Sequence, residues 1–114
     1  TGIIQAGIYG SLSDKIGKIA PIPHESTKQS GLSHTSGTIS FASLGAGTAT
    51  TEFFICIGDQ SPLDAGGPGT ADGQGFSAFG RVFKGMNIVR KIQNQNSRGD
   101  QFDKRIDIIN MERL

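Results

Sequence analysis

Short stretches of apolar or alternating residues are separated by glycine-rich polar segments along the chain, a pattern typical of β-strands joined by loops. Within residues 37–44, Ile39 and Phe41 fall on one face and Thr38 and Ser40 on the other, which predicts a half-buried strand. The apolar run 53–57 is short enough for a buried strand. The complete set of predicted strands is 2–9, 37–44, 53–57, 76–83 with a bend at Gly80, and 106–110.

One segment has the periodicity of a helix. Met86 and Val89 are spaced three apart, with Arg90 directed outward, which predicts a short amphipathic helix over residues 86–93. The polar segments between the predicted elements are rich in glycine and proline and are expected to be loops; they are residues 10–36, 58–75 and 94–103. The predicted fold class is therefore mainly β, with one short helix near 86–93.

The length of 114 residues suits one domain, and no linker or internal repeat divides it. The net charge is +1, from 11 basic and 10 acidic residues, and no block of like charge indicates a nucleic-acid or membrane partner. The lone Cys56 excludes an internal disulfide, and its apolar neighbours favour a small buried side chain over a reactive thiol. Nothing in the sequence decides between a cytoplasmic and a periplasmic location.

The common catalytic motifs are missing from the sequence. There is no Gly-x-Ser-x-Gly elbow for a hydrolase, and the aspartates of residues 59–72 lack the order of a calcium loop. His24 and His34 have no cysteine or paired carboxylate at ligand spacing. We therefore expect no metal and no cofactor, and an enzyme built on this chain would need a reaction that uses no nucleophile, metal or cofactor.

From Gly37 onward the sequence resembles the cyclophilin family of peptidyl-prolyl cis–trans isomerases. The motifs that carry the resemblance keep the family's order and spacing: Gly-Thr-Ile-Ser-Phe-Ala (37–42), Glu-Phe-Phe-Ile-Cys-Ile (52–57), Leu63-Asp64, Phe-Gly-Arg-Val (79–82) and Gly-Met-Asn-Ile-Val (85–89). Residues 58–60 and 72–76 resemble the sequences of a bacterial branch of the family. Residues 3–7, Ile-Ile-Gln-Ala-Gly, resemble the segment that carries the family's active-site glutamine. Residues 10–36 are only loosely similar.

The resemblance implies a closed antiparallel β-barrel with helices over its ends. The family's opening strands, first helix and the strand with its catalytic arginine come before Gln5 and have no counterpart here. None of the arginines present occupies that motif; they are Arg81, Arg90, Arg98, Arg105 and Arg113. We therefore expect residues 1–114 to be a single cyclophilin-like domain with an incomplete barrel, and either the natural protein is longer or the chain is a fragment. The isomerase activity of this chain by itself is doubtful.

The resemblance also assigns site residues. Gln5 is the catalytic residue present, and it would hydrogen-bond the peptide backbone; the catalytic arginine is absent. The expected substrate-binding residues are Phe54 and Leu63 in a proline pocket, Ile3 and Phe41 beside it, Ala42 and Leu44 along a groove, Glu52 in place of a common glutamine, and Phe76 in place of a common histidine. Pro62 replaces a tryptophan associated with cyclosporin binding, which leaves the drug response open. Simple core packing is the alternative for the apolar residues, and a polar strand edge is the alternative for Gln5.

Three functions remain as hypotheses. The first is an isomerase that assists protein folding by rotating the amide bond before proline. The second is a non-catalytic module that binds proline-containing peptides, and the third is a small-molecule-binding β-barrel, which would need an enclosed lumen. The expected partners are proline-containing peptides and unfolded proteins, with no nucleic acid and no membrane, bound by a monomer when the domain is complete.

Overall fold

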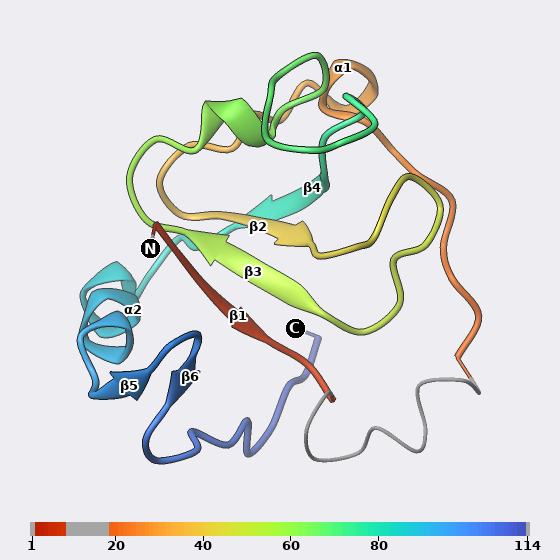
Figure 1. The fold of residues 1–114 in the computed structure, drawn as a ribbon. Helices are drawn as coiled ribbons and strands as arrows, with labels where there is room; N and C mark the ends of the chain where they lie inside the picture. Colours follow the sequence, from red (N-terminus) through yellow and green to blue (C-terminus); the bar gives the residue numbers. More distant parts are fainter. Residues whose placement is uncertain (1, 9–18, 114) are drawn as a thin grey trace.

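The computed structural model describes residues 2–8 and 19–113, and its centre is a four-stranded antiparallel sheet (Figure 1). The strands are β1 (Ile3–Ala6), β2 (Thr38–Phe41), β3 (Phe53–Cys56) and β4 (Ser77–Arg81), in the order β1-β3-β2-β4. The prediction of a mainly β fold is confirmed. Strands β1 and β4 remain at the two edges, so the described strands do not close into a barrel.

The register places one row of side chains across the sheet. Gln5 pairs with Phe54, Phe54 with Ser40, and Ser40 with Ala78. Directly paired residues of antiparallel strands share a face, so these four side chains lie on the same side of the sheet. Phe54, Ser40 and Ala78 are buried, and Gln5 is exposed at the edge.

Strand β2 is half-buried as predicted, but its more deeply buried residues are the polar ones. Thr38 and Ser40 are buried, whereas Ile39 and Phe41 are only partly covered. The hydroxyl groups find partners there: Thr38 Oγ1 donates to the Ser33 carbonyl at 2.8 Å, and Ser40 Oγ lies 2.8 Å from a ring nitrogen of a histidine. Hydrogen bonding removes most of the cost of burying these groups.

A β-bulge bends β4 at the expected place. Ile39 pairs with Gly80 while the next residue of β2 pairs with Ala78, so Phe79 is the extra residue. The Phe79 side chain is half exposed, and its ring stacks on that of Phe41 with centroids 4.3 Å apart. The bend predicted at Gly80 is thus located next to the bulge.

Within the part of the chain that the structure describes, two α-helices flank the sheet, and one of them was not predicted. Helix α2 (Met86–Gln93) has the expected bounds, follows Gly85, and buries Val89. Helix α1 (Thr27–Ser30) lies within the segment 10–36 that we expected to be loop. It is a single turn, held by a capping box between Ser26 and Gln29 and ended by Gly31 with φ of 77°. Such a short helix leaves no periodic apolar signal. Residues 9–18 of the predicted first strand and loop lie outside the described residues.

The C-terminal region differs from the prediction. Residues 94–103 contain a small hairpin, β5 (Ser97–Arg98) with β6 (Gln101–Phe102), where only loop was expected. The predicted strand 106–110 is wrong, since these residues form no regular element and their isoleucines are exposed. Alternation supplies the side-chain pattern of a strand, but a strand also needs a neighbour for its backbone hydrogen bonds, and no described strand pairs with this segment. Among the described helices, none combines the length and apolarity that a membrane crossing requires.

Candidate functional site

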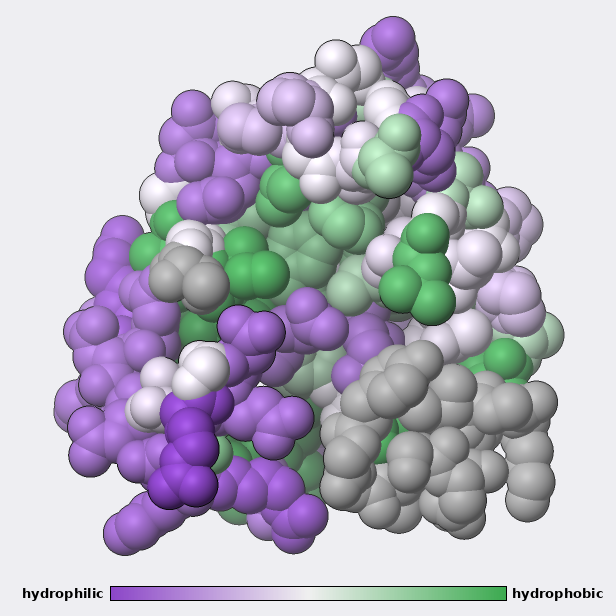
Figure 2. All heavy atoms as spheres, in the orientation of Figure 1, coloured by the Kyte–Doolittle hydropathy of each residue, from purple (hydrophilic) through white to green (hydrophobic). Residues whose placement is uncertain are grey.

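A cavity of about 490 Å³ opens on the face of the sheet that carries the Gln5–Phe54 row. Figure 2 shows apolar residues gathered over the middle of this face, with polar residues around them. Apart from Phe41, all of the site residues predicted from the sequence line the cavity: Ile3, Gln5, Ala42, Leu44, Glu52, Phe54, Leu63 and Phe76. Ser43, Thr48 and Thr50 complete the lining. The cavity thus draws on β1, β3, the loop after β2 and the loops before β4.

Phe54 forms the floor of this cavity. Its side chain is 2% exposed and lies between two other rings. The ring of Phe76 meets it edge-on, with centroids 5.3 Å apart and an interplanar angle of 79°. The ring of His34 lies nearly parallel to it, with centroids 5.8 Å apart and an angle of 17°. Aromatic contacts of this kind fix ring orientation as well as position, so the floor is a rigid apolar surface.

Leu63 and Phe76 form the wall beside the floor. Leu63 ends the 3₁₀ turn Ser61–Leu63, and its carbonyl accepts a hydrogen bond of 3.1 Å from the Phe76 amide. The two backbones can approach because Gly75 has no side chain. A Cβ at that position would lie 2.6 Å from backbone atoms of residues 63–65, and Gly75 has φ of 69°, which other residues rarely adopt.

Two polar side chains stand at the β1 side of the cavity. Gln5 is exposed, and no described residue hydrogen-bonds its amide group, which is therefore free to pair with a ligand. Glu52 is already engaged: its Oε2 accepts from the Ile8 amide at 2.9 Å and from the Thr51 hydroxyl at 2.8 Å. A side chain at Gly7 would collide with that carboxylate. Glu52 therefore fixes the end of β1 next to the cavity.

The rim is formed by the loop between β2 and β3. Leu44 is 100% exposed there, an apolar side chain with no protein contact to cover it. Asp72 ties this loop to residues 70–76, because its carboxylate accepts from the amides of Ala46 and Gln74, both at 3.0 Å. These bonds, the one from Gln74 first, hold the pKa of Asp72 below its ordinary value. The carboxylate is thus kept in the form that links the two loops.

Phe41, which the sequence placed beside the pocket, lies elsewhere. It pairs with Phe53, and both belong to the opposite face of the sheet from Phe54. Its ring packs on Phe79 instead. This placement gives no support to a substrate-binding role for Phe41.

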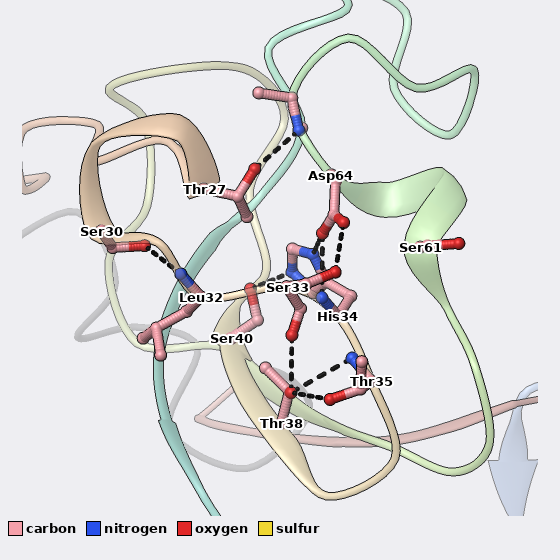
Figure 3. Close-up of polar contacts among 12 residues, drawn as sticks. Thr27, Ser30, Leu32, Ser33, His34, Thr35, Thr38, Ser40, Ser61 and Asp64 are labelled. Carbon is pink, nitrogen blue, oxygen red and sulfur yellow. Dashed lines mark hydrogen bonds and ion pairs between the residues drawn. The ribbon is translucent and has the colours of Figure 1, made fainter.

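The sequence analysis missed a group of polar residues that packs against Phe54. His34 is fully buried, and its ring nitrogens contact Asp64 and Ser40 (Figure 3). The spacing of the two histidines in the sequence gives His34 no functional role. Among residues 2–8 and 19–113, no group of three or more candidate metal ligands is found. The only available signal was the Leu63-Asp64 pair within the resemblance.

A second hollow, of about 720 Å³, lies at the β5–β6 hairpin. It is lined by Arg98, Asp100, Gln101, Phe102 and Asp103, which are mostly exposed polar residues. None of the site residues predicted from the sequence reaches it, and the aromatic floor and free amide are found at the smaller cavity. The smaller cavity is therefore the candidate site.

Comparison with known proteins gives a consistent family. Residues 2–113 match the family model described as cyclophilin type peptidyl-prolyl cis-trans isomerase/CLD. A protein of Acinetobacter baylyi named peptidyl-prolyl cis-trans isomerase is 34% identical over 93 residues, which are 81% of this chain and 46% of that protein. Peptidyl-prolyl cis-trans isomerase A of Dickeya dadantii is 35% identical over 91 residues, 79% of this chain and 45% of that protein.

The chain thus spans about half the length of the curated relatives that it matches, and both of these relatives are bacterial. The family match, in contrast, runs over nearly all of the 114 residues and includes every strand of the sheet. The chain belongs to the family of cyclophilin-type peptidyl-prolyl cis-trans isomerases.

Proposed function

We propose that the cavity over Phe54 binds the proline of an X–Pro segment, and that the full-length protein containing this chain rotates the preceding amide bond and so assists protein folding. The observation that carries the proposal is the combination, at one cavity, of a rigid apolar floor at Phe54 and a free amide at Gln5. A proline ring needs the first, and the peptide backbone beside it needs the second. Family membership supports the same reaction.

To catalyse rotation about the X–Pro amide bond, the protein needs only to hold the peptide and polarise the amide. Resonance gives the amide bond a rotation barrier of ~18–20 kcal/mol. In the twisted transition state, the nitrogen loses conjugation and gains a lone pair. An enzyme accelerates the rotation by contacts that are stronger in this state than in either planar state. The walls at Phe54, Leu63 and Phe76 would hold the ring still, and Gln5 would hold the adjoining carbonyl while the rest of the peptide turns.

The donor that meets the developing lone pair is the remaining requirement. By resemblance to the family this is an arginine from a strand that precedes Gln5, and no arginine of this chain stands in that motif. We propose that the opening strands and the first helix complete this single domain in the full-length protein and bring the arginine to the cavity. The chain by itself would bind proline peptides but isomerise them poorly, since loss of one preorganised donor costs on the order of 10²–10³ in rate.

The alternative is a binding module that holds proline-containing segments without rotating them. One experiment separates the two, an NMR exchange assay on an X–Pro peptide with three proteins: this chain, the full-length protein, and the full-length protein with its upstream arginine replaced by alanine. We expect activity only in the second and measurable peptide binding in all three. No activity in the full-length protein would favour the module, and strong activity in this chain would contradict the role of the arginine.

The proposed partners are proline-containing segments of unfolded proteins, bound by a monomer of the complete domain. The net charge of +1, without a block of like charge, supports neither nucleic acid nor a membrane surface as a partner. The exposed Leu44 at the rim favours peptides with an apolar residue near the proline.

A further inference from the structure

His34, Asp64 and Ser40 form a hydrogen-bonded polar cluster beside Phe54, buried at His34 and Ser40 and partly exposed at Asp64 (Figure 3). His34 is 0% exposed; its Nδ1 lies 2.6 Å from Asp64 Oδ1, and its Nε2 lies 2.8 Å from Ser40 Oγ. The His34 backbone amide donates to the same Asp64 oxygen at 2.9 Å, and the Ser33 hydroxyl donates to the other oxygen at 2.5 Å. Two residues that precede β2 thus hold the carboxyl group that follows the Ser61–Leu63 turn.

The direction of the hydrogen bonds follows from the charge of Asp64. Burial by itself would raise the pKa of this carboxyl group, but the bonds from Ser33 and from the His34 amide and ring together lower it. An ionised carboxylate only accepts, so the proton between the two side chains belongs to His34 Nδ1. When the ring is neutral, Nε2 then accepts from the Ser40 hydroxyl. Each polar side-chain atom of His34, Asp64 and Ser40 thus has a hydrogen-bond partner.

The order Asp64–His34–Ser40 is that of a nucleophilic triad, but the location excludes this chemistry. Ser40 is fully buried within β2, between its neighbours β3 and β4. A nucleophile must meet the reacting carbon at about 3 Å, and no substrate can come that close to a hydroxyl covered on all sides. The arrangement must therefore act on the protein itself.

These three polar residues add a second link between the floor and the wall of the cavity, beside the link through Phe76, whose ring packs on Phe54 and whose amide bonds to the Leu63 carbonyl. The His34 ring lies nearly parallel to Phe54 on β3, and Asp64 is the residue after Leu63 in the turn. We propose that His34 is a positioning residue, which holds Leu63 through Asp64 and Phe54 through its ring. It would thereby keep a fixed separation between the floor at Phe54 and the wall at Leu63. The proposal rests on the proposed function, because that separation is what would match a proline ring. A displacement of about 1 Å is enough to impair a binding geometry of this kind.

The experiment compares two aspartates on the same turn in the full-length protein. Asp64→Ala removes the acceptor of His34. Asp59→Ala removes the same charge from an exposed residue that bonds only to Ser61, at 3.0 Å to its amide and 3.3 Å to its hydroxyl. NMR measures three quantities: the affinity for an X–Pro peptide, the Leu63 methyl resonances and the Phe54 ring resonances. Thermal unfolding follows stability separately.

We expect Asp64→Ala to weaken peptide affinity by about tenfold, as for loss of a charge-assisted bond. It should also move the Phe54 resonances, although Asp64 does not touch that ring. Asp59→Ala should leave affinity within about twofold of the starting protein, as for an exposed site. If Asp64→Ala does not fold, Ser33→Ala against Ser61→Ala makes the same comparison through a single bond to the carboxylate.

Two results would overturn the inference: equal affinities for the two aspartate variants, or Phe54 resonances that stay in place when Asp64 is removed. A merely structural role for Asp64 would lower the melting temperature without either local change. If the starting protein does not bind the peptide at all, the proposed function fails instead, and the Phe54 resonances alone decide whether the two walls are coupled.

Discussion

Gln5 and Phe54 are direct partners across the β1–β3 pairing, and both face the same cavity although one is exposed and the other is 2% exposed. The pairing is possible because β1 is an edge strand, where a polar side chain can stay in water beside a buried ring. A single cross-strand pair thereby supplies both an amide for a peptide backbone and an apolar surface for a proline ring.

Phe54→Ala in the full-length protein should lower the affinity for a proline peptide by about tenfold or more, as for loss of a buried aromatic anchor. Phe41→Ala is the matched control, since Phe41 lies on the neighbouring strand but packs on Phe79 at the opposite face. Both changes will reduce stability, by up to about 3–5 kcal/mol for a buried phenylalanine. Isothermal titration and thermal unfolding separate the two effects. Equal losses of affinity in both variants would mean that Phe54 is merely a core residue.

Gly75→Ala should destabilise the wall formed by Leu63 and Phe76. Gly75 and Gly73 have nearly the same φ, 69° and 68°, but a Cβ at Gly75 meets backbone atoms of residues 63–65 and one at Gly73 meets nothing within 4 Å. Gly73→Ala therefore reports the cost of the left-handed backbone by itself. We expect Gly75→Ala to lose about 1–3 kcal/mol more, as for overpacking, and to weaken peptide binding as well. Equal free energies of unfolding for both variants would contradict the close approach.

Much of the fold followed from short-range patterns in the sequence. The run 53–57 and the spacing of Met86 and Val89 depend on neighbouring residues, and both elements were located correctly. The segment 106–110 has the same quality of local pattern, but no described strand pairs with it, which local sequence cannot reveal. Helix α1 depends on a capping box around a single turn, too short for periodicity to indicate.

The candidate site shows a similar division. The resemblance correctly predicted that Gln5, Phe54 and Leu63 line one cavity. Phe41 does not join them, because it pairs with Phe53, and successive residues of a strand such as Phe53 and Phe54 point to opposite faces. The role of His34 could not be predicted from the sequence, since its partners Ser40 and Asp64 are 6 and 30 residues away along the chain. Contacts of that kind arise only when the sheet and its loops are assembled.

The chain by itself should be poorly stable and prone to associate. Among the described strands, β1 has a partner on one side only, and large apolar side chains such as Leu44, Phe83 and Ile109 are almost wholly exposed. Unpaired edges and exposed apolar groups favour pairing with other chains. Light scattering over a concentration series should show growing oligomers, and a hydrophobic dye should bind more strongly than to the full-length protein. A monomer with one cooperative thermal transition would refute this prediction.

The stability of the full-length protein should fall in acid partly through Asp64. Although burial opposes it, the hydrogen bonds from Ser33 and His34 hold the folded-state pKa of Asp64 below its ordinary value of 3.8. As the pH falls, the unfolded chain therefore takes up a proton first, so this contribution is complete above about pH 5 and is lost as the pH drops through the folded-state pKa. Asp72, whose pKa is also lowered, adds a change of the same sign.

In Asp64→Asn, the free energy of unfolding from urea titrations should thus be lower at pH 7 but should decline less steeply between pH 5 and pH 2. Asp59→Asn, which removes one charge from an exposed carboxylate of the same loop that bonds only to Ser61, serves as the control. If the free energy of unfolding of Asp64→Asn declined as steeply with falling pH as that of the starting protein, the hydrogen bonds from His34 would not stabilise the carboxylate.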